Sequence, residues 1–309
     1  MKLTYSISEL TPYINWVYYY YAWQVKDGDE QQRLQREALD FLRQQETRYH
    51  AYALFVLAEA QGDGDDLLVY IPSEESADES QPVRIPLLRQ QQGNPCLCLS
   101  DFVRPLSSGI KDRVGVFATS VDHGMEVDFN ADPYQKMMAQ LLADRLAEAA
   151  AERMHEQVRK TYWGYAPDEQ LSVSDLHAER FQGIRPAVGY PSLPDVSLNF
   201  VIDRLLGGLN QIGIRLTESG AMRPHASVSG LMMAHPQARY FAVGTIGSDQ
   251  LTDYAHRRGL PVEIVRKFLS SNLSPLKNDR SFCHTVLRHS GIHHRSTPVV
   301  PALSQVSAQ

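Results

Sequence analysis

One long segment, residues 134–160, restricts the fold more than any other part of this chain. It is rich in Ala, Leu, Glu and Arg, residues that favour helices. Apolar side chains recur every four residues along it, which is the pattern of a helix with one buried face. They are Met138, Leu142, Leu146, Ala150 and Met154. We therefore expect a long helix with one side in the core.

Shorter patterns on both sides of this helix predict a mixture of strands and further helices. Strand patterns fall at residues 53–57, 67–71, 114–119, 227–233 and 240–246, and helical patterns at 29–49, 198–213, 248–258 and 262–269. The segment 114–119 is apolar on both faces, as in a central strand. Because strands and helices do not alternate along the chain, we expect a mixed α+β fold rather than a doubly wound one.

The charge balance argues against a nucleic-acid-binding protein. The chain has 30 Lys and Arg against 36 Asp and Glu, whereas such a protein carries a basic excess. Aromatic residues gather at 13–23 and can act as stacking platforms for bases, but no Lys or Arg lies between them, which favours core and rim packing.

The address that these features favour is cytoplasmic. No apolar run approaches the ~18 residues that span a bilayer, and the first residues lack the pattern of a signal peptide. The three cysteines are too few for a disulfide framework. We expect neither a membrane nor a nucleic acid as a partner.

The sequence argues against a dinucleotide-binding loop and against a metal site. The glycines at 207, 208 and 213 lie inside a helical pattern, so they do not form a dinucleotide-binding loop. A zinc site or a polar tail can explain the Cys and His residues near the C-terminus, and the lack of any regular pattern there favours the tail. These residues are Cys283, His284, His289, His293 and His294. We therefore predict no metal site.

Four stretches of sequence, in this order, resemble a known family. The first is residues 99–105 with Ser108-Gly109, and the second is the predicted long helix from residue 142 to 166. The third and most specific is Gly-Ile-Arg-Pro-Ala-Val-Gly-Tyr-Pro at 183–191. The fourth runs from Leu-Thr-Glu-Ser at 216–219 through Ala-Ser-Val-Ser-Gly at 226–230 to residue 255. Over about residues 5–276 the chain resembles the reactivation (activation) module of cobalamin-dependent methionine synthase.

The resemblance implies a fold and a function. The fold is a single large domain over residues 1–276, with a mostly antiparallel twisted sheet flanked by helices, followed by a polar tail over 277–309. The family's module binds S-adenosylmethionine as methyl donor to cob(I)alamin after reduction by a flavoprotein. This chain is then expected to be a free-standing accessory protein, a methyltransferase component active only with a corrinoid-bearing partner.

The resemblance implies two partner proteins, one that supplies the cobalamin and one that supplies the electron. A cobalamin-dependent methionine synthase without this module brings the cobalamin, and a flavodoxin-like protein brings the electron. Asp175-Leu176-His177 begins like the Asp-x-His-x-x-Gly motif of cobalt ligation, but Arg180 occupies the glycine position. We therefore expect no cobalt ligand in this chain.

The predicted site follows from the chemistry of S-adenosylmethionine together with the resemblance. Arg185 can hold the carboxylate with its planar fork, and Gly189 lets the backbone approach the ligand closely. The resemblance places Tyr240 along the ribose or adenine, and we expect Tyr190 to face the corrinoid. Glu148 shares a helical stripe with Leu141 and Tyr134 at the border of the apolar face, where it can meet the cationic end of the ligand. The predicted S-adenosylmethionine-binding residues are Asn15, Glu148, Arg185, Ala187, Gly189, Tyr240 and Phe241. No residue is predicted to act as a catalytic acid or base.

Several departures from the family pattern leave a second hypothesis open. Asn15 stands where the family typically has an Asp that meets the ligand's amino group, and Leu193 and Val196 replace a Cys and a His near the expected corrinoid. Arg223 and His225 replace a Trp and a Gly. The alternative is a non-catalytic protein that binds a corrinoid or a corrinoid enzyme and has lost the methyl-donor site.

Overall fold

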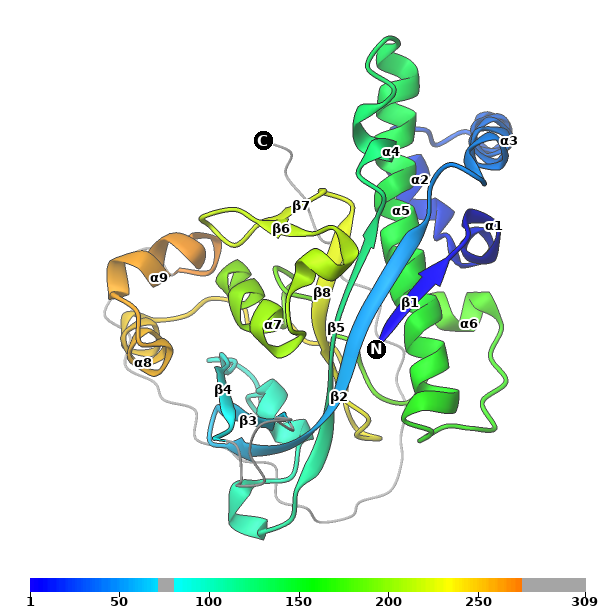
Figure 1. Cartoon of the computed structure of the whole chain (residues 1–309). Coiled ribbons are helices and arrows are strands. Elements are labelled where there is room, and N and C mark those ends of the chain that lie inside the picture. The colour runs from blue at the N-terminus through cyan, green and yellow to red at the C-terminus, as the bar shows by residue number, and fades with distance from the viewer. Residues whose placement is uncertain (72–80, 274–309) are drawn as a thin grey trace.

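A curled antiparallel sheet of six strands lies at the centre of the fold (Figure 1). The computed structural model describes residues 1–71 and 81–273. The strands are β1 (Lys2–Tyr5), β2 (Ala51–Asp63), β3 (Asp66–Tyr70), β4 (Val83–Pro86), β5 (Asp112–Val121) and β8 (Ser227–Met232). Their order is β4-β3-β2-β5-β8, and β1 pairs with the first residues of β2. The α+β class with an antiparallel sheet is thus as predicted.

Helices cover both faces of this sheet. They are α1 (Ile7–Leu10), α2 (Trp16–Ala22), α3 (Gly28–Gln45), α4 (Gly124–Val127), α5 (Pro133–Gln157), α6 (Val173–His177), α7 (Asn199–Leu205), α8 (Ser248–Arg258) and α9 (Val262–Phe268). Figure 1 shows α5 with α1, α2 and α3 on one side of the sheet, and α7, α8 and α9 on the other. A small hairpin of β6 (Arg215–Leu216) and β7 (Met222–Arg223) lies apart from the main sheet.

Helix α5 confirms the strongest sequence pattern. Asp132 caps its start by accepting a hydrogen bond of 2.9 Å from the Tyr134 N–H, and Pro133 occupies the first helical position. All five predicted core residues of this helix are at most 2% exposed. They pack with β2, β5 and α1–α3 in what we call the first core. Beyond Gln157 the helix continues as a π-helical turn, Val158–Tyr162, closed by a 2.9 Å hydrogen bond from the Trp163 N–H to the Val158 carbonyl.

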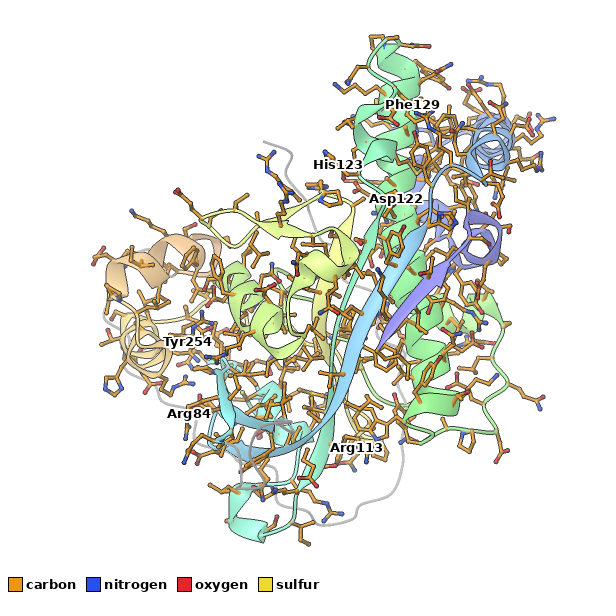
Figure 2. All side chains as sticks on the ribbon, viewed as in Figure 1. Arg84, Arg113, Asp122, His123, Phe129 and Tyr254 are labelled. Carbon is orange, nitrogen blue, oxygen red and sulfur yellow. The ribbon has the colours of Figure 1, made fainter. Side chains whose placement is uncertain are left out.

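The opposite face of the sheet forms a second core with α7 and residues 97–103. The strand predictions for 53–57, 67–71, 114–119 and 227–233 are confirmed, as β2 and β3 form a hairpin and β5 lies between β2 and β8. The helix predictions for 29–49, 248–258 and 262–269 correspond to α3, α8 and α9. Buried Tyr254 of α8, labelled in Figure 2, donates a 2.7 Å hydrogen bond to Asp195.

Two predicted elements are wrong. The helix predicted over 198–213 is broken, because Gly207 and Gly208 have φ of +69° and +107°, outside the helical region. Only α7 and a 3-10 turn, Leu209–Ile212, remain of it. The strand predicted over 240–246 is a loop: its Val243 N–H bonds the carbonyl of Pro191 in another loop, and its Ile246 N–H bonds the carbonyl of Asn272 in a 3-10 turn, rather than a neighbouring strand.

The predicted tail over residues 277–309, including Cys283 and the four histidines, lies outside the described residues. Among the residues that are described, no helix is both long and apolar enough to cross a membrane.

Candidate ligand-binding site

The motif at residues 183–191 pairs with the free edge of β8. The N–H of Ile184 and the N–H of Met233 each bond the other residue's carbonyl at 2.9 Å. Further along, the Leu231 N–H donates to the Pro186 carbonyl at 3.0 Å. The third and fourth stretches of the resemblance are therefore neighbours in space, and the motif extends the sheet by one short antiparallel segment.

Arg185 and Tyr240, two of the predicted ligand-binding residues, lie together. The Tyr240 hydroxyl accepts a 2.9 Å hydrogen bond from the backbone N–H of Arg185. The Arg185 side chain turns toward α5, where its Nη2 lies 3.3 Å from Oε2 of Glu152 and its Nη1 lies 3.4 Å from Nδ1 of His155. Only 12% of this side chain is exposed. Arg185 is thus held against the long helix rather than free in a surface loop.

A second buried arginine completes the group around His155. Nη1 of Arg159 lies 2.9 Å from His155 Nδ1, and the other guanidinium nitrogens bond Glu169 at 2.6–3.1 Å. Neither His155 nor Arg159 is exposed. Burial, and then the charges of Arg185 and Arg159, hold the pKa of His155 well below its usual value. The imidazole is therefore neutral at physiological pH.

Geometry also fixes the tautomer of His155. Two guanidinium groups, which have only N–H donors, face Nδ1, so Nδ1 must carry the lone pair. The proton is then on Nε2, which lies 3.3 Å from the Tyr165 hydroxyl oxygen. Sequence reasoning missed this group. Its signal was the spacing of Glu148, Glu152, His155 and Arg159, at i, i+4, i+7 and i+11, which puts four polar side chains on one stripe of a helix otherwise rich in Ala and Leu.

Glu148 and Tyr190 contact each other. The Tyr190 hydroxyl donates a 2.7 Å hydrogen bond to Oε1 of Glu148, and the carboxylate raises the pKa of the phenol. Tyr190 is 49% exposed and lies at the tip of a tight turn in which Gly189 has φ of +88°. The Tyr190 N–H closes this turn on the Ala187 carbonyl at 3.2 Å. Glu148, a predicted ligand-binding residue, and Tyr190, the predicted corrinoid-facing residue, are thus joined by a hydrogen bond.

The structure does not bring Asn15 and Phe241 into this group. Asn15 caps α2, where its Oδ1 accepts a 3.2 Å hydrogen bond from the Val17 N–H. The Phe241 ring packs against Phe102, with centroids 6.5 Å apart, on the side of the second core. Within residues 1–71 and 81–273, no hydrogen bond or ion pair joins either residue to Arg185.

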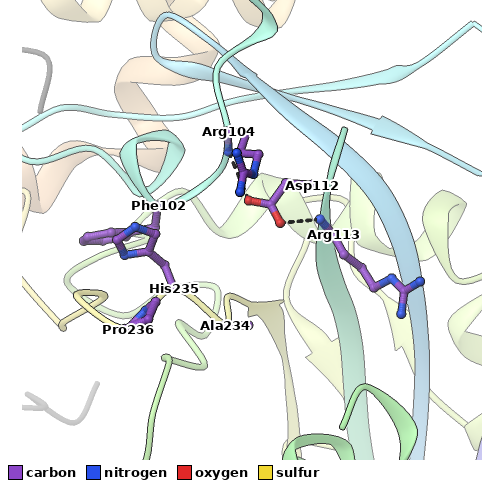
Figure 3. Close-up of a pocket in the computed structure, with 7 residues that line it drawn as sticks. All are labelled: Phe102, Arg104, Asp112, Arg113, Ala234, His235 and Pro236. Atoms are coloured by element: carbon purple, nitrogen blue, oxygen red, sulfur yellow. Dashed lines mark hydrogen bonds between the residues drawn. The ribbon is translucent and has the colours of Figure 1, made fainter. Parts of the chain in front are cut away.

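A hollow of about 340 Å³ lies near the site, where β5 begins and β8 has ended (Figure 3). Its polar wall is organised by Asp112, whose carboxylate accepts the backbone N–H groups of Arg104 at 3.2 Å and Arg113 at 2.8 Å. Figure 3 shows the Arg113 side chain leading away from Phe102 and His235. None of the predicted site residues lines this hollow.

The fold and the site define an α+β domain in which a polar stripe on one long helix meets an edge segment of the sheet. Residues 6–259 match the model of the family described as vitamin B12 dependent methionine synthase, activation domain. This chain belongs to that family. It is similar to the crystal structure of the MetH reactivation domain bound to AdoHcy, with 38% identity and a TM-score of 0.82 over 88% of this chain and 90% of that one. The predicted resemblance is confirmed.

Proposed function

We propose that this protein binds S-adenosylmethionine and serves as the methyl-donating component in the reductive reactivation of a cobalamin-dependent methionine synthase. The observation that carries the proposal is the incomplete hydrogen bonding of Arg185. Its guanidinium makes two long contacts, of 3.3 and 3.4 Å, to Glu152 and His155. Arg159, in the same group, makes four contacts of 2.6–3.1 Å.

A guanidinium has five N–H donors in a fixed plane. In the part of the chain that the structure describes, the Nε of Arg185 has no hydrogen-bond partner, while Nη1 and Nη2 have one each. No Arg185 nitrogen is among the buried side-chain atoms without a partner in the described residues, so its unused donors are open to water and to a ligand. The carboxylate of an amino-acid ligand fits these donors, because it can accept two parallel N–H groups from one arginine.

The bound molecule of the related structure supports the same ligand class. AdoHcy, S-adenosylhomocysteine, is what remains of S-adenosylmethionine after its methyl group has left. In this chain the adenosine part of such a ligand would lie along the backbone of Ala187–Gly189 and the Tyr240 ring. The half-exposed Tyr190 at the tip of the turn would then mark where a corrinoid approaches.

The work of the protein in this function is positioning. The methyl leaves the sulfonium for reduced cobalamin, which a partner supplies, and no proton has to move in that step. Holding donor and acceptor in line lowers the barrier by removing the cost of bringing them together. The partners we propose are a cobalamin-dependent methionine synthase that lacks this module and a flavodoxin-like electron donor, in the cytoplasm, with no role for nucleic acid or membrane.

The alternative is a non-catalytic protein that binds a corrinoid or its enzyme. Asn15 in place of Asp favours it, because a neutral amide brings no charge to the ligand's ammonium. The exchange at Leu193 favours it less, since this side chain is 3% exposed and packs in the second core, where it is screened from a partner.

Two measurements separate these functions. Isothermal titration calorimetry of the full chain should detect S-adenosylmethionine and S-adenosylhomocysteine at one site. A mixture of the chain, a methionine synthase truncated before its own module, a strong reductant and methyl-labelled S-adenosylmethionine should then label cobalamin. Equal labelling without the chain, or no binding of either nucleoside, would favour the non-catalytic alternative.

A further inference from the structure

We propose that His155 is a positioning residue, which aims the Arg185 guanidinium at the carboxylate of the ligand. This inference rests on the proposed function and concerns a residue that never touches the ligand itself. It is carried by the chain of contacts from Glu169 through Arg159 and His155 to Arg185.

The far end of this chain is rigid. Arg159 is fixed by Glu169 and by the Phe181 ring, whose centroid lies 4.4 Å from the guanidinium carbon. The same Phe181 ring packs against the imidazole of His155, with ring centroids 5.0 Å apart and an interplanar angle of 89°. Arg159 and Phe181 therefore hold the His155 side chain in place, and none of it is exposed.

The near end leaves Arg185 partly free. Neutral His155 has a single lone pair on Nδ1, which Arg159 approaches at 2.9 Å and Arg185 at 3.4 Å. Arg159 makes the shorter hydrogen bond to Nδ1. The longer contact orients the Arg185 guanidinium but leaves most of its N–H donors unused. Glu152 supplies the second guide at 3.3 Å, and its other oxygen, Oε1, is buried without a partner among the described residues.

These two acceptors define the direction of the guanidinium plane. Glu152 and His155 stand three residues apart on one stripe of α5, and they engage Nη2 and Nη1 respectively. Three of the five donors of Arg185 stay available, including Nε–H. The side chain at position 155 must therefore offer a hydrogen-bond acceptor where Nδ1 lies. A positive charge at this position would repel both arginines.

Two variants of similar polarity test this requirement. Asn places its amide oxygen near the position of Nδ1, whereas Gln places it one atom farther, near Nε2. The ligand pair is S-adenosylmethionine and its decarboxylated form, which keeps the sulfonium and the ammonium but has no carboxylate for Arg185. Affinities are measured by calorimetry on the full chain, and thermal unfolding checks that each variant is folded.

We expect the wild-type chain to prefer S-adenosylmethionine over the decarboxylated ligand by about tenfold or more, the effect of one charge-assisted hydrogen bond. His155→Gln should lose most of that preference while its affinity for the decarboxylated ligand stays within about twofold, and His155→Asn should keep the preference. A purely structural residue would weaken both ligands alike in both variants.

Retention of the full preference in folded His155→Gln would overturn the positioning role, and so would an equal loss for both ligands. Should His155→Gln fail to fold, loss of the preference in His155→Asn would overturn it as well. Failure of the proposed function looks different, because the wild-type chain itself would then bind neither ligand.

Discussion

The carbonyl oxygen of Pro186 occupies the place where a side chain at Gly230 would begin. A Cβ atom at Gly230 would lie 2.2 Å from that oxygen and 2.9 Å from the Cα of Ala187. Both obstacles are backbone atoms, so neither can move aside by changing a rotamer. The close docking of the 183–191 motif on β8 therefore depends on the absence of a side chain at Gly230.

Gly230→Ala should consequently push the motif off the sheet. We expect a loss of ~1–3 kcal/mol in the free energy of unfolding, the usual cost of overpacking, together with weaker S-adenosylmethionine binding because Arg185 moves with the motif. Denaturant unfolding and calorimetry measure the two effects. Gly28→Ala is the control, since nothing lies within 4 Å of a Cβ there. A Gly230→Ala chain with wild-type stability would show that the motif does not need this close approach.

Arg185→Ala should weaken S-adenosylmethionine binding by roughly ten- to a hundredfold, as expected for loss of a hydrogen bond to a charged group worth ~1.5–3 kcal/mol. The matched control is Arg180→Ala, because the Arg180 side chain is 69% exposed and pairs with Asp175 at the surface. Calorimetry on both variants gives the comparison. An unchanged affinity in folded Arg185→Ala would remove Arg185 from the site.

Asn15→Asp should tighten binding by up to about tenfold, or ~1.4 kcal/mol, because a carboxylate would attract the ligand's ammonium. The helix should not suffer, since Asp and Asn cap helices equally well and the Val17 N–H keeps its acceptor. Asn15→Ala separates the two roles by removing the cap, at a cost of ~0.5–2 kcal/mol in stability. If Asn15→Asp leaves the affinity unchanged, position 15 does not lie at the ammonium.

The buried His155 should make the fold sensitive to mild acid. Burial and the charges of Arg185 and Arg159 lower its pKa in the folded chain, whereas the unfolded chain takes up a proton near pH 6.5. Its contribution to stability is therefore complete above that pH and is lost as the pH falls below it. The loss should approach ~1.4 kcal/mol per pH unit.

This loss is measured as the difference in unfolding free energy between wild type and His155→Gln at several pH values between about 7.5 and 5. The comparison cancels the exposed His225, whose pKa is raised through its hydrogen bond to Asp144 and whose contribution has the opposite sign. A difference that stays constant over this range would mean that His155 can be protonated in the folded chain.

The sequence predicted α5 well because an apolar residue recurs every four positions from Met138 to Met154, a spacing that fits a helix and not a strand. It failed at residues 240–246, where a strand-like composition meets no partner strand among the described residues, and at Gly207-Gly208, where a helical repeat is broken by backbone conformation alone. At residues 240–246 the rest of the fold decides against the regular element, whereas at Gly207-Gly208 the local backbone conformation does.

The candidate site was predictable only in part. Arg185 and Tyr240 lie in short sequence motifs that resemble the family, so both could be predicted from the sequence. Glu152 and His155 belong to no such motif, because their partner Arg185 lies about 30 positions away and Glu169, which binds Arg159, lies beyond the end of α5. Contacts of that kind exist only once the tertiary fold exists.

The π-helical turn at the end of α5 has a consequence for how relatives can differ. Such a turn fits one residue more than an α-helical turn into a single revolution, so deleting one residue from Val158–Tyr162 would leave a regular α-helical turn with the residues after it in the same rotational phase. Tyr165, whose hydroxyl lies 3.3 Å from His155 Nε2, would then stay on the same side of the helix axis. A relative one residue shorter at this turn can therefore keep the arrangement of the site, whereas the same deletion inside the regular part of α5 would rotate the following residues by about 100°.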